Sequence, residues 1–150
     1  MRVLIDTSIV VRTAQPGTVA CAEALAALTN LDARGAERFI VPQVLYEYWV
    51  VCTRPSNQNG LGFSAIQAET DLERLKQLFL LLRDERSIFE HWQKLVVGHS
   101  VLGKTAHDTR LAAAMQRHQL SHILTFNKSD FVRYPHVIAV TPGDVLSGVA

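Results

Sequence analysis

Four acidic residues, spread along the whole chain, are the best candidates for chemistry in this sequence: Asp6, Glu47, Asp108 and Asp130. Asp6 directly follows an apolar run and Asp130 lies shortly after another, so both are predicted near the carboxyl ends of strands, where open α/β sheets bind ligands. Glu47 and Asp108 fall in segments of helical pattern, on or beside faces that should point inward. Buried carboxylates need a cation, a hydrogen-bond network or a proton.

A cluster of these carboxylates would require compensating charge. Two carboxylates about 5 Å apart repel by roughly 3 kcal/mol at an effective dielectric constant near 20. Hard oxygen ligands select Mg²⁺ or Mn²⁺, which keep several waters and share their coordination with substrate phosphate. Such ions lower the pKa of a bound water and stabilise the leaving oxygen of an in-line displacement. The pattern therefore indicates metal-dependent phosphate-ester hydrolysis, by a nuclease or, with the same parts, by a phosphatase.

Three of the acids also have ordinary structural explanations. Asp6 could cap a helix that begins at the next residue. Asp108 could complete a helix start with Thr105, and Asp130 could be an acid in a turn. With Glu47 included, however, four structural explanations must all hold at positions that all map near one edge of one sheet. The joint pattern favours a site.

Glu47 is harder to explain structurally, because the helical stripe it shares is apolar. A purely structural role would need a buried ion pair with Arg54 or Arg110. The stripe consists of Val44, Val50 and Val51. On physical grounds alone, Glu47 is therefore the strongest of the four.

Strands and helices alternate along the chain. The apolar runs predict strands at 2–5, 38–41, 122–126 and 137–140. Helical spacing and capping residues predict helices from about 7 to the Pro16-Gly17 turn and then at 18–34, 42–53, 64–82, 89–97 and 105–119. The alternation predicts an α/β fold: a parallel sheet of about four or five strands with helices on both faces.

The bulk properties set limits on the class of protein. The 150 residues suit a single domain, residues 1–150, and the formal net charge of +1 does not point to a nucleic-acid partner. Cys21 and Cys52 stand apart without a CxxC pattern, which favours two buried thiols in a reducing compartment. The N-terminus does not resemble a signal peptide and the apolar run 75–82 is too short to span a bilayer, so a cytoplasmic protein is expected.

Four segments of the sequence contain the four acids in turn: VLIDTS (3–8), VPQVLYEYWVVCTRP (41–55), GKTAHDTRLAAAM (103–115) and LTFNKSDF (124–131). They resemble the successive motifs of PIN domains, and most closely those of the VapC-type toxins of bacterial toxin–antitoxin modules. The motifs lie in the same order and cover essentially the whole chain. The segment NGLGF at 59–63 also resembles a loop found in one branch of those proteins.

The resemblance implies a single PIN-like domain with Mg²⁺- or Mn²⁺-dependent endoribonuclease activity. By position, Asp6, Glu47 and Asp108 would be the main metal ligands, and Asp130 would be the fourth acid. Four further residues would hydrogen-bond the ligands: Thr7, Ser8, Thr125 and Asn127. The two lysines beside the third and fourth acids, Lys104 and Lys128, are predicted RNA contacts.

The resemblance also implies partners that the residues themselves do not reveal: a cognate antitoxin and a second copy of the chain in a homodimer. Two alternatives remain open, a catalytically silent PIN fold that binds RNA or protein, and a metal-dependent phosphatase. One departure from the leanest toxins is the longer segment between the second and third acids, with its predicted helix at 64–82.

Overall fold

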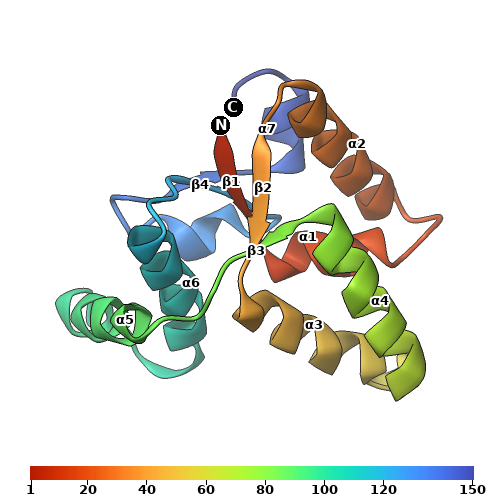
Figure 1. Ribbon diagram of the computed structural model, residues 1–150, viewed down its shortest axis with the longest axis horizontal. Coiled ribbons are helices and arrows are strands. Elements are labelled where there is room, and N and C mark those ends of the chain that lie inside the picture. The colour runs from red at the N-terminus through yellow and green to blue at the C-terminus, as the bar shows by residue number, and fades with distance from the viewer.

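A computed structural model describes residues 1–150 and shows one five-stranded, wholly parallel sheet (Figure 1). The order across the sheet is β3-β2-β1-β4-β5. The strands are β1 (Arg2–Ile5), β2 (Glu37–Ile40), β3 (Leu80–Leu81), β4 (His122–Leu124) and β5 (Ile138–Val140). The α/β fold with a parallel sheet, predicted from the alternation of elements, is confirmed.

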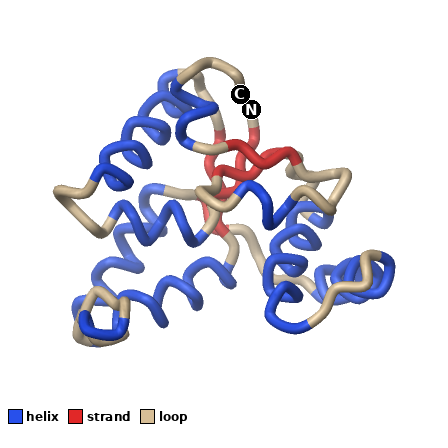
Figure 2. The backbone as a smooth tube through the Cα atoms, turned by 180° about the vertical axis from the view of Figure 1, so that it is seen from behind, coloured by secondary structure: helices blue, strands red, loops and turns tan.

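Seven α-helices cover the sheet. Helices α5 and α6 pack together on one side, and α2 and α7 pack together on the other (Figures 1 and 2). Three short 3₁₀ turns, η1 (Ser56–Gln58), η2 (Gly103–Thr105) and η3 (Lys128–Phe131), lie in the connections. The helices are α1 (Thr7–Thr13), α2 (Val19–Ala33), α3 (Pro42–Thr53), α4 (Ala65–Leu78), α5 (Arg86–Gly98), α6 (Ala106–Arg117) and α7 (Pro142–Leu146).

The central strand β1 is the middle of the core. Val3, Leu4 and Ile5 are completely buried, as expected for a parallel strand covered on both faces. They belong to a single cluster of 33 buried apolar residues contributed by the sheet and the helices around it. Because β1 is rigidly held, the residue that follows it, Asp6, has a fixed position at the carboxyl edge of the sheet.

Local sequence signals set the bounds of the helices that position the site. Pro42 occupies the start of α3, and the helix ends at Thr53, before Arg54-Pro55, as predicted. Ser64 and Gln67 form both hydrogen bonds of a capping box at the start of α4. Gly35 follows α2 with φ +71°, the left-handed conformation that suits glycine at a helix end.

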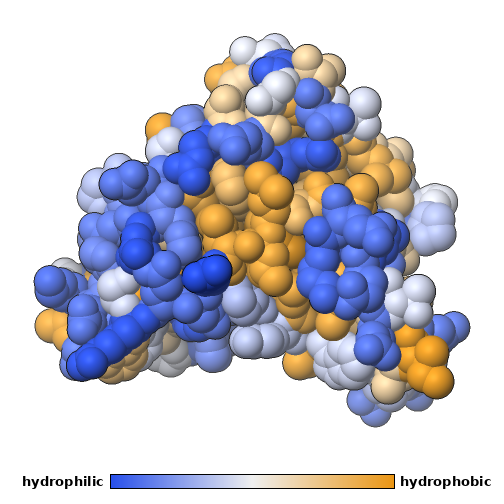
Figure 3. All heavy atoms as spheres, in the orientation of Figure 1, coloured by the Kyte–Doolittle hydropathy of each residue, from blue (hydrophilic) through white to orange (hydrophobic).

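The predicted helix at 64–82 is wrong at its C-terminal end. Helix α4 stops at Leu78, Phe79 is extended, and Leu80 and Leu81 form β3 beside β2. The reason is tertiary: β2 presents an open edge, and its backbone gains bonds to the arriving chain, including Leu82 N–H to the Ile40 carbonyl at 2.9 Å. Both leucines of β3 are exposed, and an apolar area covers this part of the molecular face (Figure 3).

Helix α3 is tied to α4 by a polar cluster within the apolar packing. The buried Tyr48 donates its hydroxyl hydrogen bond to Asp71, which also accepts from Arg74 Nε at 2.5 Å. The cluster fixes the helix that carries Glu47. Both cysteines are free and buried. None of the seven helices has the length and hydrophobicity that a membrane-spanning segment needs.

Candidate active site

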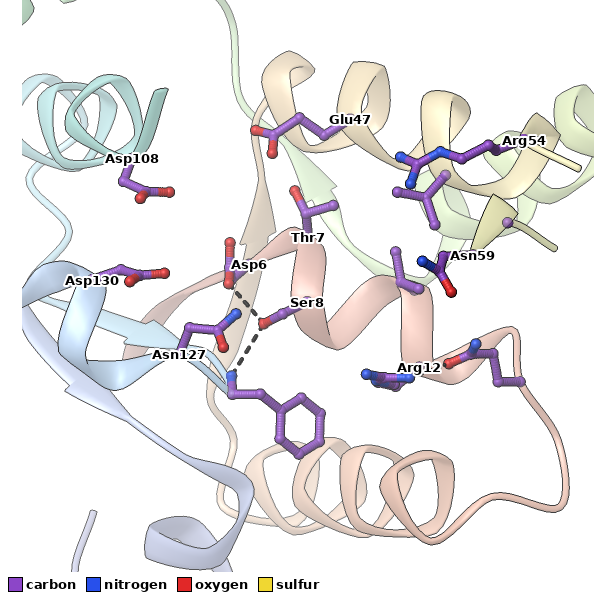
Figure 4. A pocket seen from close by; sticks show the side chains of 15 residues that line it. Asp6, Thr7, Ser8, Arg12, Glu47, Arg54, Asn59, Asp108, Asn127 and Asp130 are labelled. Carbon is purple, nitrogen blue, oxygen red and sulfur yellow. Dashed lines mark hydrogen bonds between the residues drawn. The ribbon is translucent and has the colours of Figure 1, made fainter. Parts of the chain in front are cut away.

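All four acids predicted from the sequence line one cavity at the carboxyl edge of the sheet (Figure 4). The cavity has a volume of about 610 Å³. Asp6 follows β1, Glu47 lies in α3, Asp108 in the first turn of α6, and Asp130 in η3 after β4. Four elements far apart in the sequence therefore bring their carboxylates to one place.

Asp6 is buried, with 7% of its surface exposed, and its side chain is held by two hydroxyl groups. Ser8 Oγ and Thr125 Oγ1 both donate to Asp6 Oδ2 at 2.7 Å. Burial raises the pKa of Asp6, and these two hydrogen bonds oppose the rise. Asp6 occupies the N-cap position of α1 without forming a side-chain capping hydrogen bond, although the backbone N–H groups of Thr7 and Ser8 also oppose the rise in its pKa.

The two hydroxyls are themselves oriented by the backbone that follows β4. Ser8 Oγ accepts from Phe126 N–H at 3.1 Å, and Thr125 Oγ1 accepts from Asn127 N–H at 2.9 Å. Each hydroxyl has one hydrogen to donate, and these acceptor bonds direct it to Asp6. Because both bonds reach the same oxygen, neither of them engages Asp6 Oδ1.

Glu47 is half-buried on the other side of the cavity. Gln43 Nε2 donates to Glu47 Oε1 at 2.7 Å and also to the His107 carbonyl at 2.8 Å, which links α3 to α6. Burial raises the pKa of Glu47, the Gln43 bond opposes the rise, and Asp6 adds to it. Glu47 forms no ion pair with Arg54 or Arg110.

The inward face assigned to Glu47 was only partly right. Val44 is completely buried, but Val50 is 57% exposed. Glu47 thus lies at the border between the core face of α3 and the solvent, which leaves its carboxylate open to the cavity.

Asp108 and Asp130 lie next to each other along the remaining wall, and both carboxylates point into the cavity (Figure 4). Burial raises the pKa of Asp108 to about 6, with further contributions from the charges of Asp130, Asp6 and Glu47. Thr105 precedes α6 without a side-chain capping bond, so a capping box does not explain Asp108. Asp130 is exposed on its 3₁₀ turn. The charges of the other three acids therefore all act on Asp108.

None of these four carboxylates is neutralised by a basic side chain. The chain has 14 acidic residues, and eight of them form ion pairs. The six without a basic partner are the four acids of the cavity and the exposed Glu23 and Glu69. Negative charge is therefore concentrated, uncompensated and partly buried in one place, an arrangement that favours binding of a cation.

The side chains fit a hard divalent cation that retains part of its water shell. The cavity offers carboxylate, hydroxyl and amide oxygens, and Thr7 Oγ1 beside the acids is buried without any hydrogen-bond partner. No three acidic, histidine or cysteine side chains lie close enough together to enclose an ion by themselves. Mg²⁺ commonly binds through one or two carboxylates, with waters and substrate phosphate completing its shell, so the open arrangement suits it.

The predicted lysines do not line the cavity. Lys128 pairs with Asp144 at 3.0 Å, and Lys104 lies exposed in η2. Their role as RNA contacts is still a prediction, and it concerns the surface outside the cavity. The basic residues that do line it are Arg12 and Arg54, accompanied by Gln15 and Asn59. The sequence suggested Arg54 only as an ion-pair partner for Glu47. The residues around Arg54 contain no signal that the chain folds back there and places this arginine at the cavity.

The raised carboxylate pKa values predict that the metal-free protein is more stable in mild acid. A raised pKa means that the folded state binds protons at higher pH than the unfolded state, so stability falls as pH rises through this window. Between pH 7.5 and 5.5 we expect a gain on the order of 1 kcal/mol after solvent screening, or about 2–4 °C in Tm.

Two variants test whether this pH-dependent rise in Tm comes from Asp108. Asp108→Asn should show a smaller rise in Tm between the two pH values, because the pKa of Asp108 is raised to about 6 by burial and by neighbouring charge. Glu23→Gln, at an exposed acid outside the cavity, should show the full rise. Equal rises in wild type and Asp108→Asn would contradict the assignment.

Comparison with known proteins gives a consistent result. Residues 3–137 match the family model of the PIN domain. No curated protein matches the sequence significantly.

Several solved structures share the fold at low sequence identity. A chain of VapBC-1 from nontypeable Haemophilus influenzae superposes with a TM-score of 0.71 at 13% identity, covering 95% of this chain and 99% of that chain. A toxin–antitoxin complex from Klebsiella pneumoniae gives 0.62 at 21% identity, covering 93% and 97%. Mycobacterium tuberculosis VapC20, described as a Sarcin-Ricin loop cleaving toxin, gives 0.63 at 16% identity, covering 85% and 92%. At these identities the similarity establishes the fold.

Proposed function

Since this chain belongs to the PIN-domain family, we propose that it is a Mg²⁺- or Mn²⁺-dependent endoribonuclease that hydrolyses phosphodiester bonds of RNA in the cytoplasm. The observation that carries this proposal is the set of four carboxylates without basic partners around one cavity. Asp6, Glu47 and Asp108 are the proposed metal ligands, and Asp130 supports them. A bound divalent ion would activate a water for attack on phosphorus and stabilise the departing oxygen.

The residues of the chain prepare the site in distinct ways. Ser8 and Thr125 fix Asp6 through one oxygen, and so keep its carboxylate in one orientation. Gln43 does the same for Glu47 from the neighbouring turn of α3. Burial and the neighbouring acids raise the pKa of Asp108 to about 6 in the metal-free protein, and a bound cation would favour its charged form.

We further propose that the protein is the toxin of a toxin–antitoxin pair. The support comes from its fold neighbours, several of which are described as VapBC or toxin–antitoxin complexes. A cognate antitoxin and a homodimer are the proposed partners. Expression of the chain alone should arrest growth, and co-expression of a small protein encoded beside it should relieve the arrest and co-purify with it.

The purified protein is expected to cleave RNA only when Mg²⁺ or Mn²⁺ is added, and EDTA should stop the reaction. The same ions should raise the Tm in the absence of RNA, because binding to the folded state stabilises it by about 2.7 kcal/mol at a hundredfold excess over Kd. For a chain of this length that is a shift of roughly 5–10 °C. Ca²⁺ and Na⁺ at matched ionic strength are the controls.

The two measurements separate the alternatives. A metal-induced rise in Tm with cleavage of a phosphomonoester but not of RNA would indicate a phosphatase. RNA binding with neither cleavage nor a rise in Tm would indicate a catalytically silent PIN fold. Either result would overturn the ribonuclease proposal.

A further inference from the structure

The cavity that holds the four acids has a second end of opposite charge. Arg12 from α1 and Arg54 from the end of α3 both line it, with Asn59 between them (Figure 4). Gln15 also lines the cavity and is hydrogen-bonded to Arg12. Asp6, Asp108 and Asp130 lie on the other side of the same view, and Glu47 lies between Asp108 and Arg54. One continuous cavity therefore passes from an anionic region to a cationic region.

The two guanidinium groups have no carboxylate partner. Neither Arg12 nor Arg54 takes part in any of the eight ion pairs of the chain. Arg12 Nη1 donates to Oε1 of Gln15, two residues beyond the end of α1, at 2.8 Å, and this bond holds the group in place without neutralising it. Two arginines that share a cavity and lack anions are suited to binding an anion from outside the chain.

The backbone that carries Arg54 and Asn59 is firmly built. Beyond Arg54 the chain reverses and its N–H groups bond to carbonyls at the end of α3: Leu61 to Val51 at 3.2 Å, Phe63 to Cys52 at 2.8 Å and Gly62 to Arg54 at 2.9 Å. These bonds satisfy carbonyls that a helix end leaves free. We call residues 55–63 the return loop.

Gly60 shows how closely the return loop approaches α3. A Cβ atom at Gly60 would lie 1.9 Å from the Arg54 carbonyl oxygen, so only glycine fits. Asn59 precedes it with φ +60°, a left-handed conformation that asparagine tolerates. The return loop therefore places Arg54 and Asn59 at the cavity by close backbone packing.

We propose that Arg12 and Arg54 bind the phosphodiester that neighbours the scissile one, so that the RNA strand must extend from the acids toward α1 and the return loop to be cut. This proposal rests on the proposed ribonuclease function, because the acids define where the scissile phosphate lies. Val11 and Val51, which also line the cavity, give the adjacent nucleoside an apolar surface to lie against. Guanidinium groups bind phosphate oxygens through two parallel hydrogen bonds, which positions a strand as well as attracting it.

The first test measures binding without chemistry. In the Asp6→Asn background, a labelled single-stranded RNA is titrated by fluorescence anisotropy at several NaCl concentrations, with Arg54→Met and Arg12→Met as test variants. Each is expected to weaken binding about tenfold and to reduce the slope of log K against log salt by about 0.7, the contribution of one phosphate contact on a single strand.

Arg133→Met is the matched control, since Arg133 is an exposed arginine that does not line the cavity. Its binding and salt slope should equal those of the parent. The Tm of every variant is recorded, and Arg54→Lys shows whether charge alone suffices. Arg54→Met and Arg12→Met binding as tightly as Arg133→Met, with an unchanged salt slope, would overturn the proposal.

The second test locates the phosphate. RNAs carrying a single uncharged methylphosphonate at each linkage beside the mapped cut are supplied to the wild-type enzyme. The methylphosphonate at one linkage is expected to raise KM about tenfold. With that RNA, Arg54→Met should raise KM no further, because the uncharged linkage has already removed the interaction with the arginine. Independent, multiplicative losses at every linkage would overturn the assignment. If wild type cleaves no RNA, the ribonuclease function fails, while the anisotropy comparison still decides whether the arginines bind RNA.

Discussion

Replacing Asp6 with asparagine is expected to reduce RNA cleavage on the order of a thousandfold or more while the protein remains folded. Asparagine has nearly the same shape, and its carbonyl oxygen can accept the bonds that Ser8 and Thr125 now donate to Asp6 Oδ2. The negative charge is lost, and with it the most buried of the proposed metal ligands. The measurement is the single-turnover cleavage rate at saturating Mn²⁺.

The stability of the same variant should move in the opposite direction. Burial raises the pKa of Asp6, which means that its charge destabilises the metal-free fold at neutral pH. Asp6→Asn should therefore melt at a higher temperature than wild type without metal, and should gain less from Mn²⁺. Glu23→Gln and Glu69→Gln, at the two exposed acids that also lack ion pairs, should match wild type in both measurements. Equal cleavage by Asp6→Asn and wild type would contradict the assigned role.

Gly60→Ala is expected to destabilise the protein by about 2–3 kcal/mol, as overpacking against fixed backbone does. The new Cβ would meet the Arg54 carbonyl oxygen at 1.9 Å and its carbonyl carbon at 2.3 Å, and neither atom can yield without moving the end of α3. Urea denaturation gives the free energy of unfolding. Because the return loop packs against the backbone of Arg54, RNA binding should weaken as well.

Gly98→Ala is the matched control for this change. Gly98 ends α5, has an ordinary φ, and would meet nothing within 4 Å on gaining a Cβ. Alanine there should be neutral or stabilising by up to about 1 kcal/mol, since it restricts the unfolded chain. A Gly60→Ala protein as stable as Gly98→Ala would show that the return loop adapts easily, and that Arg54 is not held by it.

Most of the fold could be predicted because its signals are local. Pro42 and Arg54-Pro55 mark the two ends of α3, and the Ser64 capping box marks the start of α4. Strand β3 could not be predicted in this way. Its two leucines continue a helical pattern, and only the open edge of β2 makes the extended conformation favourable.

The predicted parallel sheet indicated that the four acids lie near one edge, but it did not indicate how deeply each acid is buried. The helical stripe predicted that Glu47 lies on or beside an inward face, whereas Asp6 is the buried acid and Glu47 lies at the border where Val50 is exposed. Periodicity gives the face of a helix, while the neighbouring elements decide how far that face is covered.

The cationic end of the cavity shows why proximity in sequence is a poor guide to a site. Lys128 lies two residues from Asp130 but pairs with Asp144. Arg12 and Arg54 are distant in sequence and share the cavity because α1 and the end of α3 meet there. Arg54 directly follows α3, and the return loop packs against its backbone.

The order of strands has a consequence for the protein while it is being synthesised. Strand β1 is made first, but its neighbour β4 ends at Leu124, and the hydroxyl of Thr125 that orients Asp6 comes directly after it. At about 5–20 residues per second, roughly 6–24 s separate the two ends of this contact on the ribosome. A growing chain therefore has no assembled acidic cluster during nearly all of its translation, and the messenger RNA that encodes it is not exposed to the finished cavity until the last strands emerge.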